Sequence, residues 1–350
     1  MKSFLILKLP LLLAVTLFYC CTSKKEVSQK YSADFFSPSN VWNDTDGNPI
    51  NAHGGGILFH EGTYYWYGEY KKGKTYLPEN INWEAYRTDV AGISCYSSKD
   101  LLKWKYEGLV LSAVKDDANH DLHTSKVLER PKVIFNKKTG KFVMWMHIDS
   151  ADYGKAAAGV AVSNSPTGHF QYLESFRPNN AMSRDQTVFV DDDSKAYQFY
   201  SSEDNKTMYI SQLTDDYLKP SGTFTRNFEN LSREAPAVFK YKNKYYIISS
   251  GCSGWDPNVA EIASADTIMG PWTIQKEQPC KGKDADKTFY AQSTHVIPVQ
   301  GKDGAFIAMF DKWNKKDLEN SRYVWLPLTI SENEVSIPWL EKWNMSVFDK

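Results

Sequence analysis

Short runs of alternating apolar and polar residues make up most of the chain from about Phe35 onward. The runs are rich in β-branched and aromatic residues and are separated by Gly, Asn and Asp turns, as Thr63–Gly68 and Ala305–Phe310 illustrate. Alternation with a period of two is typical of β-strands, and no run sustains the period of an amphipathic helix. The sequence therefore predicts an all-β protein.

The runs recur in five similar units. Each unit has polar residues, an apolar strand, a turn and a second apolar strand, and the units begin about fifty to eighty residues apart. Their first residues are His53, Glu129, Arg184, Arg233 and Gln292. Segments that we expect to be outer strands joined by loops lie between the units: Ser97–Trp104, Ser163–Phe170 and Ala265–Trp272.

This repeat predicts a five-bladed β-propeller with four strands in each blade. A β-sandwich is the alternative, but it does not explain why polar residues open every unit. Near the C-terminus, Arg322–Ile330 is expected to be a late strand that closes the ring. Its segment Trp325–Leu328 is expected to pack and not to bind.

The N-terminus has the features of an export signal. Lys2 and Lys8 flank Leu9–Tyr19, an apolar stretch too short for an ordinary membrane span, and Cys20 and Cys21 follow it. This order is similar to a bacterial lipoprotein signal, in which a cysteine becomes the acylated first residue. The residues before the cysteines are bulkier than usual, so an ordinary secretory signal is the alternative.

We therefore predict a signal peptide over 1–21, a short tether over 22–34 and a single propeller domain over 35–350. The mature protein is expected in the periplasm or at the outer membrane or cell surface of a bacterium. The predicted lipid anchor is Cys20 or Cys21.

The amino-acid composition limits the kinds of molecule that the protein is expected to bind. Lys and Arg number 41 against 42 Asp and Glu, so no strongly basic surface is available for nucleic acid. Membrane contact is expected only through the anchor, and we expect a monomer. Aromatic residues make up 14% of the chain and either fill β-sheet cores or form platforms for sugars.

Three cysteines follow the signal: Cys95, Cys252 and Cys280. They allow one disulfide, for which Cys252–Cys280 is the most plausible pair, or three separate thiols. No CxxC motif is present, so a structural zinc site is not expected.

Polar residues that precede the innermost strand of each blade should meet at one mouth of the central channel. This set contains carboxylates, arginines and neutral polar groups: His53, Glu129, Arg130, Arg184, Asp185, Arg233, Glu234, Gln292 and His295. Neighbouring carboxylates and arginines shift one another's pKa values. Glycoside hydrolysis needs such a set, because one carboxylic acid must stay protonated while other groups hold water. Buried ion pairs without any chemistry are the alternative.

These motifs resemble glycoside hydrolase family 43. The resemblance rests on His53–Ile57 with Tyr64–Glu69, Glu129–Val133, Arg184 with Asp185, and Arg233–Ala237. The stretch Asp44–Gly56 is similar, more narrowly, to the exo-β-1,3-galactanase branch. The resemblance covers roughly Phe35 to the C-terminus. It implies an inverting hydrolase on a five-bladed propeller that acts on β-1,3-galactan or arabinogalactan oligosaccharides.

The resemblance also implies two catalytic roles. Glu234, in the fourth unit, is expected to be the general acid. Asp185, in the third unit, is expected to raise the pKa of that acid and to orient the sugar. The two expectations agree physically, because a nearby anion stabilises the protonated form of a carboxylic acid.

The general base departs from the family pattern. Most members use an Asp at the start of the first blade, where this chain has Ala52 and His53. The galactanase branch also lacks that Asp, and a Gln of the last blade, here Gln292, is proposed to hold the attacking water. Glu129 is expected to bind substrate and is the alternative base. The missing Asp also fits a protein without activity.

The resemblance implies a sugar contact from Tyr153, and Glu84 or Glu69, Trp255 and His53 are further candidates. The alternative is a surface or core-edge role for Glu84 and Glu69, and a packed loop position for Trp255. Trp255 would offer an aromatic platform for the apolar face of galactose. His295 lies near the axis, where some relatives hold a hydrated calcium ion, but we assign no metal and no cofactor.

Two other functions remain open. One is an arabinosidase, arabinanase or xylosidase of the same family, against which the missing first-blade Asp argues. The other is a sugar-binding propeller without catalysis, against which the presence of both Glu234 and Asp185 argues. The chain has no Ser-His-Asp elbow, phosphate loop or dinucleotide fingerprint.

Overall fold

The strands of the protein form five small sheets in a ring, a five-bladed β-propeller, as predicted. The computed structural model describes Met1 and residues 34–79, 83–331 and 334–349. The predicted signal peptide, its two cysteines and nearly all of the predicted tether lie outside the described residues. Among the described residues, no helix has the length and hydrophobicity that a membrane span requires.

Each blade is an antiparallel sheet whose strands follow chain order, with the innermost strand first in every blade. Blade 1 contains β1 (His53–His60), β2 (Thr63–Lys71), β3 (Val90–Ser98) and β4 (Lys105–Ser112). Blade 2 contains β5 (Val127–Asn136), β6 (Lys141–Asp149), β7 (Ala157–Ser163) and β8 (Gln171–Phe176). Blade 3 contains β9 (Gln186–Val190), β10 (Ala196–Ser202), β11 (Thr207–Leu213) and β12 (Pro220–Asn227).

Blade 4 contains β13 (Arg233–Tyr241), β14 (Lys244–Gly251), β15 (Glu261–Ala265) and β16 (Thr273–Ile274). Blade 5 contains β18 (Gln292–Pro298), β19 (Phe306–Lys312), β20 (Arg322–Ser331) and β21 (Glu334–Pro338), and β17 (Cys280–Lys281) adds a parallel strand at its edge. Short 3-10 turns connect strands or follow them: η1 (Pro178–Asn180), η2 (Ala285–Tyr290), η3 (Leu318–Asn320) and η4 (Met345–Phe348). The five predicted units are therefore the two inner strands of the five blades.

The hydrophobic core is divided among the interfaces between blades. Separate clusters lie between blades 1 and 2, 2 and 3, and 3 and 4, and the largest cluster joins blades 4, 5 and 1. Blade 1 meets blade 5 through Trp66 and Trp325, both fully buried with ring centroids 4.8 Å apart. Because each blade packs against a neighbour on both faces, its inner strands are apolar almost throughout.

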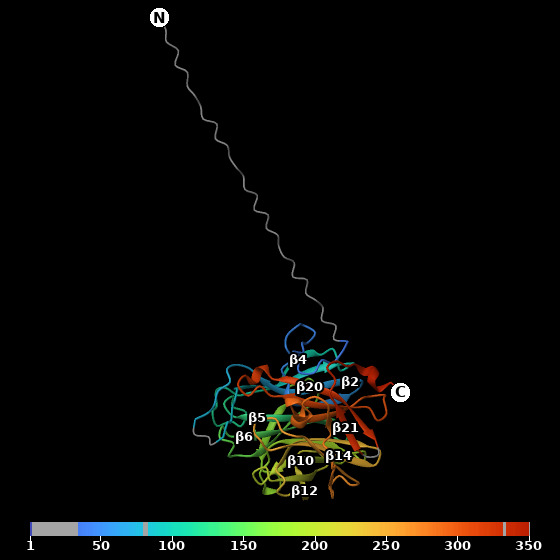
Figure 1. The fold of residues 1–350 in the computed structure, drawn as a ribbon. Coiled ribbons are helices and arrows are strands. Elements are labelled where there is room, and N and C mark those ends of the chain that lie inside the picture. The colour runs from blue at the N-terminus through green and yellow to red at the C-terminus, as the bar shows by residue number, and fades with distance from the viewer. Residues whose placement is uncertain (2–33, 80–82, 332–333, 350) are drawn as a thin grey trace. The chain divides into compact units, whose positions relative to one another are not determined.

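The ring closes where the first and last blades meet, so that β2 and β20 lie side by side (Figure 1). The expected closing strand Arg322–Ile330 lies within β20, which is the third strand of blade 5 and not a strand added to blade 1. Trp325 packs in the core, as expected. Closure depends on contacts between complete blades, such as the hydrogen bond from Thr294 Oγ1 to the Gly55 carbonyl at 2.7 Å.

Four of the innermost strands have a β-bulge at or near their start, and in β18 the pairing register shifts between Ser293 and His295. In the other three, the register shifts after His53 in β1, after Glu129 in β5 and after Glu234 in β13. The residues that follow, Gly54, Arg130 and Ala235, have positive φ angles of 58°, 53° and 54°. A bulge inserts one extra residue and changes the direction of the neighbouring side chains. It therefore aims the opening residues of these blades at the mouth of the channel.

Candidate active site

A cavity of about 670 Å³ opens at the end of the channel where the innermost strands begin. Arg233 and His295 do not line this cavity, but the other polar residues that were predicted to converge from blades 2 to 5 meet in its wall. These residues are Glu129, Arg130, Arg184, Asp185, Glu234 and Gln292. Blade 1 contributes Glu69, near the end of β2, to the same wall.

Glu234, the predicted general acid, is buried in the wall of this cavity. Burial raises the pKa of its carboxyl to about 8, and the nearby charge of Asp185 adds to the rise. Its Oε1 accepts a hydrogen bond from Gln292 Nε2 at 3.0 Å, and Oε2 has a long contact of 3.4 Å from Asn205. The Cys252 thiol also contacts this carboxyl group. Glu234 is therefore protonated at neutral pH and has one oxygen available to a ligand.

Arg130 connects the other groups of the site. Its Nη2 forms an ion pair with Asp185 at 2.8 Å and donates to Gln292 Oε1 at 2.5 Å. Its Nη1 donates to the carbonyl of Ser293 at 3.1 Å, and its backbone N–H donates to Glu69 Oε1 at 3.0 Å. This buried guanidinium fixes Asp185 and Gln292 relative to each other.

Gln292 is fully hydrogen-bonded. Its Oε1 accepts from Arg130 and from Trp313 Nε1 at 3.0 Å, and its Nε2 donates to Glu234 and to Ser250 Oγ, each at 3.0 Å. An amide oxygen has two lone pairs and an amide nitrogen two N–H donors, so all four positions are used. A water molecule can bind to this amide only by replacing one of these partners.

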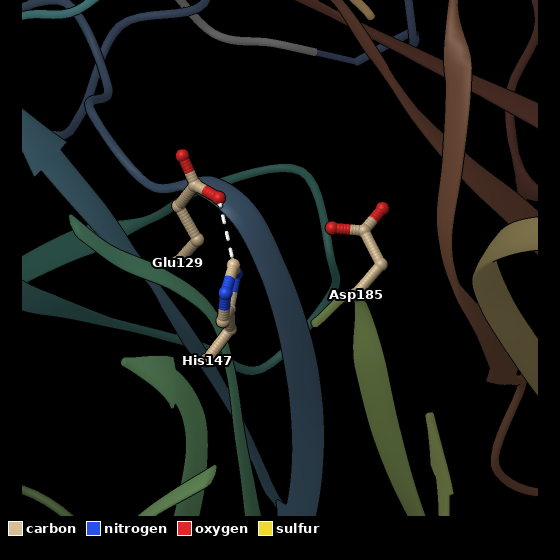
Figure 2. A group of neighbouring side chains, drawn as sticks. All are labelled: Glu129, His147 and Asp185. Carbon is tan, nitrogen blue, oxygen red and sulfur yellow. Dashed lines mark ion pairs between the residues drawn. The ribbon is translucent and has the colours of Figure 1, made fainter. Parts of the chain in front are cut away.

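Glu129 belongs to a buried chain of charged groups. His147 lies between two carboxylates, with Nδ1 at 3.3 Å from Glu129 (Figure 2) and Nε2 at 2.9 Å from Asp149. Burial opposes charge on the imidazole, but the two carboxylates outweigh it and raise the pKa of His147 to about 9. Burial likewise opposes charge on Glu129, but the contacts with His147 outweigh it and lower the pKa to about 2. Glu129 is therefore an anion at neutral pH.

Asp149 also orders the loop that carries Tyr153. Its Oδ1 accepts hydrogen bonds from the backbone N–H groups of Ser150 and Ala156, each at 2.9 Å. Tyr153 lies within this loop at a φ of 59°, and its hydroxyl donates to Glu129 Oε1 at 2.9 Å. Asp149 thus holds in place both His147 and the loop of Tyr153, the two residues that contact Glu129.

Aromatic rings form another part of the wall. Trp255 and Trp313 meet edge to face with centroids 5.1 Å apart, and Trp83 meets Tyr153 in the same way at 5.2 Å. At the rim, Lys315 binds Glu84 at 2.7 Å and Asp256 at 2.8 Å. The cavity therefore combines apolar ring faces with a protonated acid and several anions, a combination that suits a sugar.

Comparison with known proteins identifies the family. The profile of the glycosyl hydrolases family 43 matches residues 57–326, which is most of the chain. The chain belongs to glycoside hydrolase family 43. A search of curated proteins finds no significant match.

Solved structures place this family 43 hydrolase in a particular branch. A family 43 β-1,3-galactosidase, solved with galactodeoxynojirimycin, is 42% identical over 89% of this chain and all of its own, with a TM-score of 0.82. The exo-β-1,3-galactanase of Phanerochaete chrysosporium, solved with galactose, is 35% identical over 88% of this chain and 67% of its own (TM-score 0.78). That of Clostridium thermocellum is 36% identical over 88% and 66% (TM-score 0.78). The predicted family and branch are thus confirmed, and the protein is a glycoside hydrolase of this branch.

The predicted sugar-contacting residues lie at different depths. Tyr153, Glu84, Glu69 and Trp255 all line the cavity. Glu69 is almost fully buried, and its two oxygens are taken by Lys71 Nζ at 2.7 Å and the Arg130 N–H. His53 is fully buried outside the cavity wall, with its ring stacked on Tyr323.

The family resemblance would place a calcium ion near His295, but the axis does not fit one. Calcium prefers oxygen ligands, and the Lys132 side chain passes close to this imidazole. The two side chains share the space beside Gly56: a Cβ at this glycine would lie 2.5 Å from Lys132 Cδ and 3.5 Å from His295 Nδ1. Lys132 Nζ donates to the Gly54 carbonyl at 2.8 Å and contacts Thr294 Oγ1 at 3.4 Å. The Lys132 amine therefore occupies the Gly54 and Thr294 oxygens that could otherwise bind a metal ion.

The three described cysteines are separate thiols, so the disulfide alternative is wrong and the alternative of free thiols is confirmed. Cys95 and Cys280 are buried. Cys252 is exposed in the wall of the cavity, where its Sγ lies 3.5 Å from Asn205 Nδ2.

Sequence reasoning assigned no role to His147, Trp313 or Lys71. Lys71 is the last residue of β2, and Trp313 directly follows β19. No motif in the sequence around either residue indicates a role in the site. His147 pairs with Glu129 across β5 and β6 only because of the bulge. Arg130 was part of the expected convergence, but its central position comes from contacts with three blades.

Proposed function

We propose that this family 43 hydrolase is an exo-acting, inverting β-1,3-galactanase that releases galactose from the end of a galactan chain. The single observation that carries the proposal is the pair of opposite carboxyl states in one cavity. Glu234 has a pKa of about 8 and Glu129 a pKa of about 2. The β-1,3-galactosidase solved with galactodeoxynojirimycin and the Phanerochaete chrysosporium exo-β-1,3-galactanase solved with galactose support the choice of substrate.

In this proposal Glu234 donates its proton from Oε2 to the glycosidic oxygen as the bond to the anomeric carbon breaks. Asp185 keeps that proton in place through its negative charge, and the ion pair with Arg130 fixes its position. Water attacks the opposite face of the sugar ring, so the released galactose has the inverted, α configuration.

We further propose that substrate entry frees Gln292 to orient this water. A sugar between Glu234 and Gln292 would break their 3.0 Å hydrogen bond and leave one N–H of the amide without a partner. Glu129 is the weaker candidate for the base, because a carboxylate with a pKa of about 2 has little affinity for a proton. Its anionic state suits the binding of a sugar hydroxyl, with Tyr153 as a fellow contact.

The first test is incubation of the purified protein with β-1,3-galactan and β-1,3-galactobiose, followed by proton NMR. Early release of α-galactose supports an inverting exo-galactanase. Cleavage of arabinan or xylan oligosaccharides alone would replace the substrate and keep the family. Sugar binding without any hydrolysis would overturn the catalytic proposal.

The general acid is tested by Glu234→Gln. Turnover of galactobiose should fall by about a hundredfold to ten-thousandfold, because proton donation is lost while the shape of the site is kept. Glu334→Gln, a change of the same type at an exposed position on β21, is the matched control and should leave turnover unchanged. Equal rates in the two variants would contradict the role of Glu234.

We also propose that the protein is exported and lipid-anchored. The proposal rests on the charged, apolar and cysteine segments at the N-terminus that precede the propeller. Replacement of both Cys20 and Cys21 by Ser should move the protein from the membrane fraction to the soluble fraction of the cell. Unchanged membrane recovery would exclude acylation at these cysteines.

A further inference from the structure

A second cavity lies beside blade 1, and no residue of the first cavity belongs to its wall. Its volume is about 330 Å³, at the lower end of the range for small-molecule sites. The loop 44–51, the end of β2 and the segment 319–323 contribute most of its wall. The wall is completed by Val41, Trp42, Tyr96 near the end of β3, and Tyr106 near the start of β4. The loop belongs to the motif that resembles the galactanase branch, yet the proposed chemistry does not use it.

Tyrosine rings form one wall of this second cavity. The ring centroid of Tyr106 lies 6.4 Å from that of Tyr70 and 5.0 Å from that of Tyr96. Tyr70 and Tyr106 are half-buried, and their hydroxyls make no hydrogen bond within the part of the chain that the structure describes. The wall therefore offers apolar ring faces together with free hydroxyl groups.

Charged groups of both signs surround the rings and balance one another: Asp44 and Glu319 against Lys72 and Arg322. Asp44 Oδ1 holds the loop by accepting the backbone N–H groups of Asp46 and Asn48, which leaves Oδ2 without a partner among the described residues. Within the described residues, the hydrogen bonds of Arg322 come from Nη1 alone, which donates to two backbone carbonyls. A balanced set of donors and acceptors favours a neutral, hydroxyl-rich ligand over a phosphate or an acidic sugar.

The second cavity opens at the same end of blade 1 as the active site. Side chains alternate between the two faces of a strand, so Glu69 and Tyr70 of β2 point to opposite faces of the blade. Glu69 lines the active-site cavity and Tyr70 the second cavity. The loop after β19 connects them as well, with Lys315 in the first and Glu319 in the second.

We propose that the second cavity binds a neutral glycan and holds a segment of the galactan chain other than the end in the active site. The apolar face of a sugar ring would stack on Tyr70 or Tyr106, and its hydroxyls would pair with the phenols, Arg322 and Asp44. Such a site raises the affinity for a polymer without taking part in the reaction. This inference rests on the proposed galactanase function.

The test compares a long and a short substrate. In Tyr70→Ala and in Tyr106→Ala, the KM for β-1,3-galactan should rise by about threefold to tenfold, as expected for the loss of one aromatic contact. The kcat/KM for β-1,3-galactobiose should stay within about twofold of wild type, because the disaccharide occupies only the active site. Phe224→Ala removes an exposed ring on β12 and is the matched control.

Two further measurements keep the proposal testable. Asn48→Arg adds bulk at an exposed position on the rim and should raise the KM for galactan in the same way without touching the core. Electrophoresis in gels that contain β-1,3-galactan measures binding without turnover, and both kinds of variant should migrate faster than wild type. Unchanged KM and migration in the folded variants would overturn the second site. Failure of the wild type to cleave galactobiose would count against the proposed function alone.

Discussion

Glu129 and Glu234 carry the same carboxyl group, and their surroundings hold them in opposite protonation states. The difference comes from the nearest charge. Glu234 lies near the anion Asp185, whereas Glu129 contacts the imidazolium of His147. Glu234 is buried and Glu129 is largely buried, so water screens the neighbouring charges only weakly. At the scale of single residues, the site is therefore defined by pairs of groups.

The first prediction concerns the acid. Because Glu234 must be protonated, kcat/KM should be lost as the pH rises through about 8. Asp185→Asn removes the anion that helps to raise this pKa, so the alkaline limb should move to lower pH in addition to any loss of rate. The pH profile of galactobiose hydrolysis measures both. A limb that stays in place would show that Asp185 does not act on Glu234.

A second prediction concerns His147, which we regard as a positioning residue. Its folded pKa of about 9 lies above the ordinary value of 6.5, so its contribution to stability is fully present below about pH 6.5 and is lost as the pH rises through 9. His147→Gln should remove this pH dependence from the free energy of unfolding. Loss of one partner of a buried ion pair should destabilise the fold by roughly 3–5 kcal/mol at neutral pH.

Urea unfolding at several pH values measures the stability of this variant. In parallel, the acid limb of kcat/KM should move to higher pH, because Glu129 loses the cation that lowers its pKa. Glu129→Gln is the reference, and His147→Gln should not shift the acid limb further in its presence. An unaltered acid limb in the single variant would leave His147 with a structural role only.

At the scale of elements, bulges at the starts of the innermost strands build the site. Gly54 adopts the left-handed conformation directly after His53, and a Cβ at this position would lie 2.1 Å from Glu69 Oε1. Glu69 in turn accepts the N–H of Arg130, which occupies the corresponding bulge of blade 2. The bulges of neighbouring blades are thus connected by one carboxylate.

Gly54→Ala tests this connection. The variant should lose about 2–4 kcal/mol of stability, from backbone strain and from the clash with Glu69 together. Gly62→Ala is the matched control, because Gly62 also has a positive φ, of 72°, but faces open space. It should lose only about 1–2 kcal/mol. Similar losses in the two variants, measured by thermal or urea unfolding, would show that the packing against Glu69 contributes little.

At the scale of the whole molecule, five blades place their first residues around one axis. The channel below the active site is lined with buried polar groups, of which His53 and His295 have pKa values lowered by burial to about 3. Asp311, whose pKa burial raises to about 7, and Lys132, whose pKa burial lowers to about 7, lie in the same region. The protein thus places a carboxyl group and an amine of its own near the axis.

Chelation provides the corresponding prediction. Because Lys132 uses the Gly54 carbonyl and the Thr294 hydroxyl, excess EDTA should leave both the melting temperature and kcat unchanged. Lys132→Ala should lower the melting temperature, since it leaves a cavity and two buried polar groups with fewer partners. A fall in melting temperature with EDTA that calcium restores would contradict this account of the axis.

The sequence by itself determined the strands, the five blades and the convergence of Glu129, Asp185, Glu234 and Gln292. These features follow from local rules, because the period of two and the turn residues act over a few positions. The family resemblance then supplied roles that geometry alone would not distinguish. Glu84 and Tyr153 were also predicted from the sequence to belong to the site.

The tertiary structure decided which groups touch. An uninterrupted β5–β6 hairpin, extended from the pairing of Asn136 with Lys141, would place Glu129 opposite Ile148, but the bulge moves the pairing by one residue to His147. Gln292 and Arg130, which contact each other in the site, lie 162 positions apart, and the other partners of Gln292 lie 21 to 58 positions away. Burial, which shifts the pKa values of the site, likewise exists only once the blades have packed. The pattern along the chain therefore predicted where the chemistry lies, and only contacts between distant segments decided its protonation.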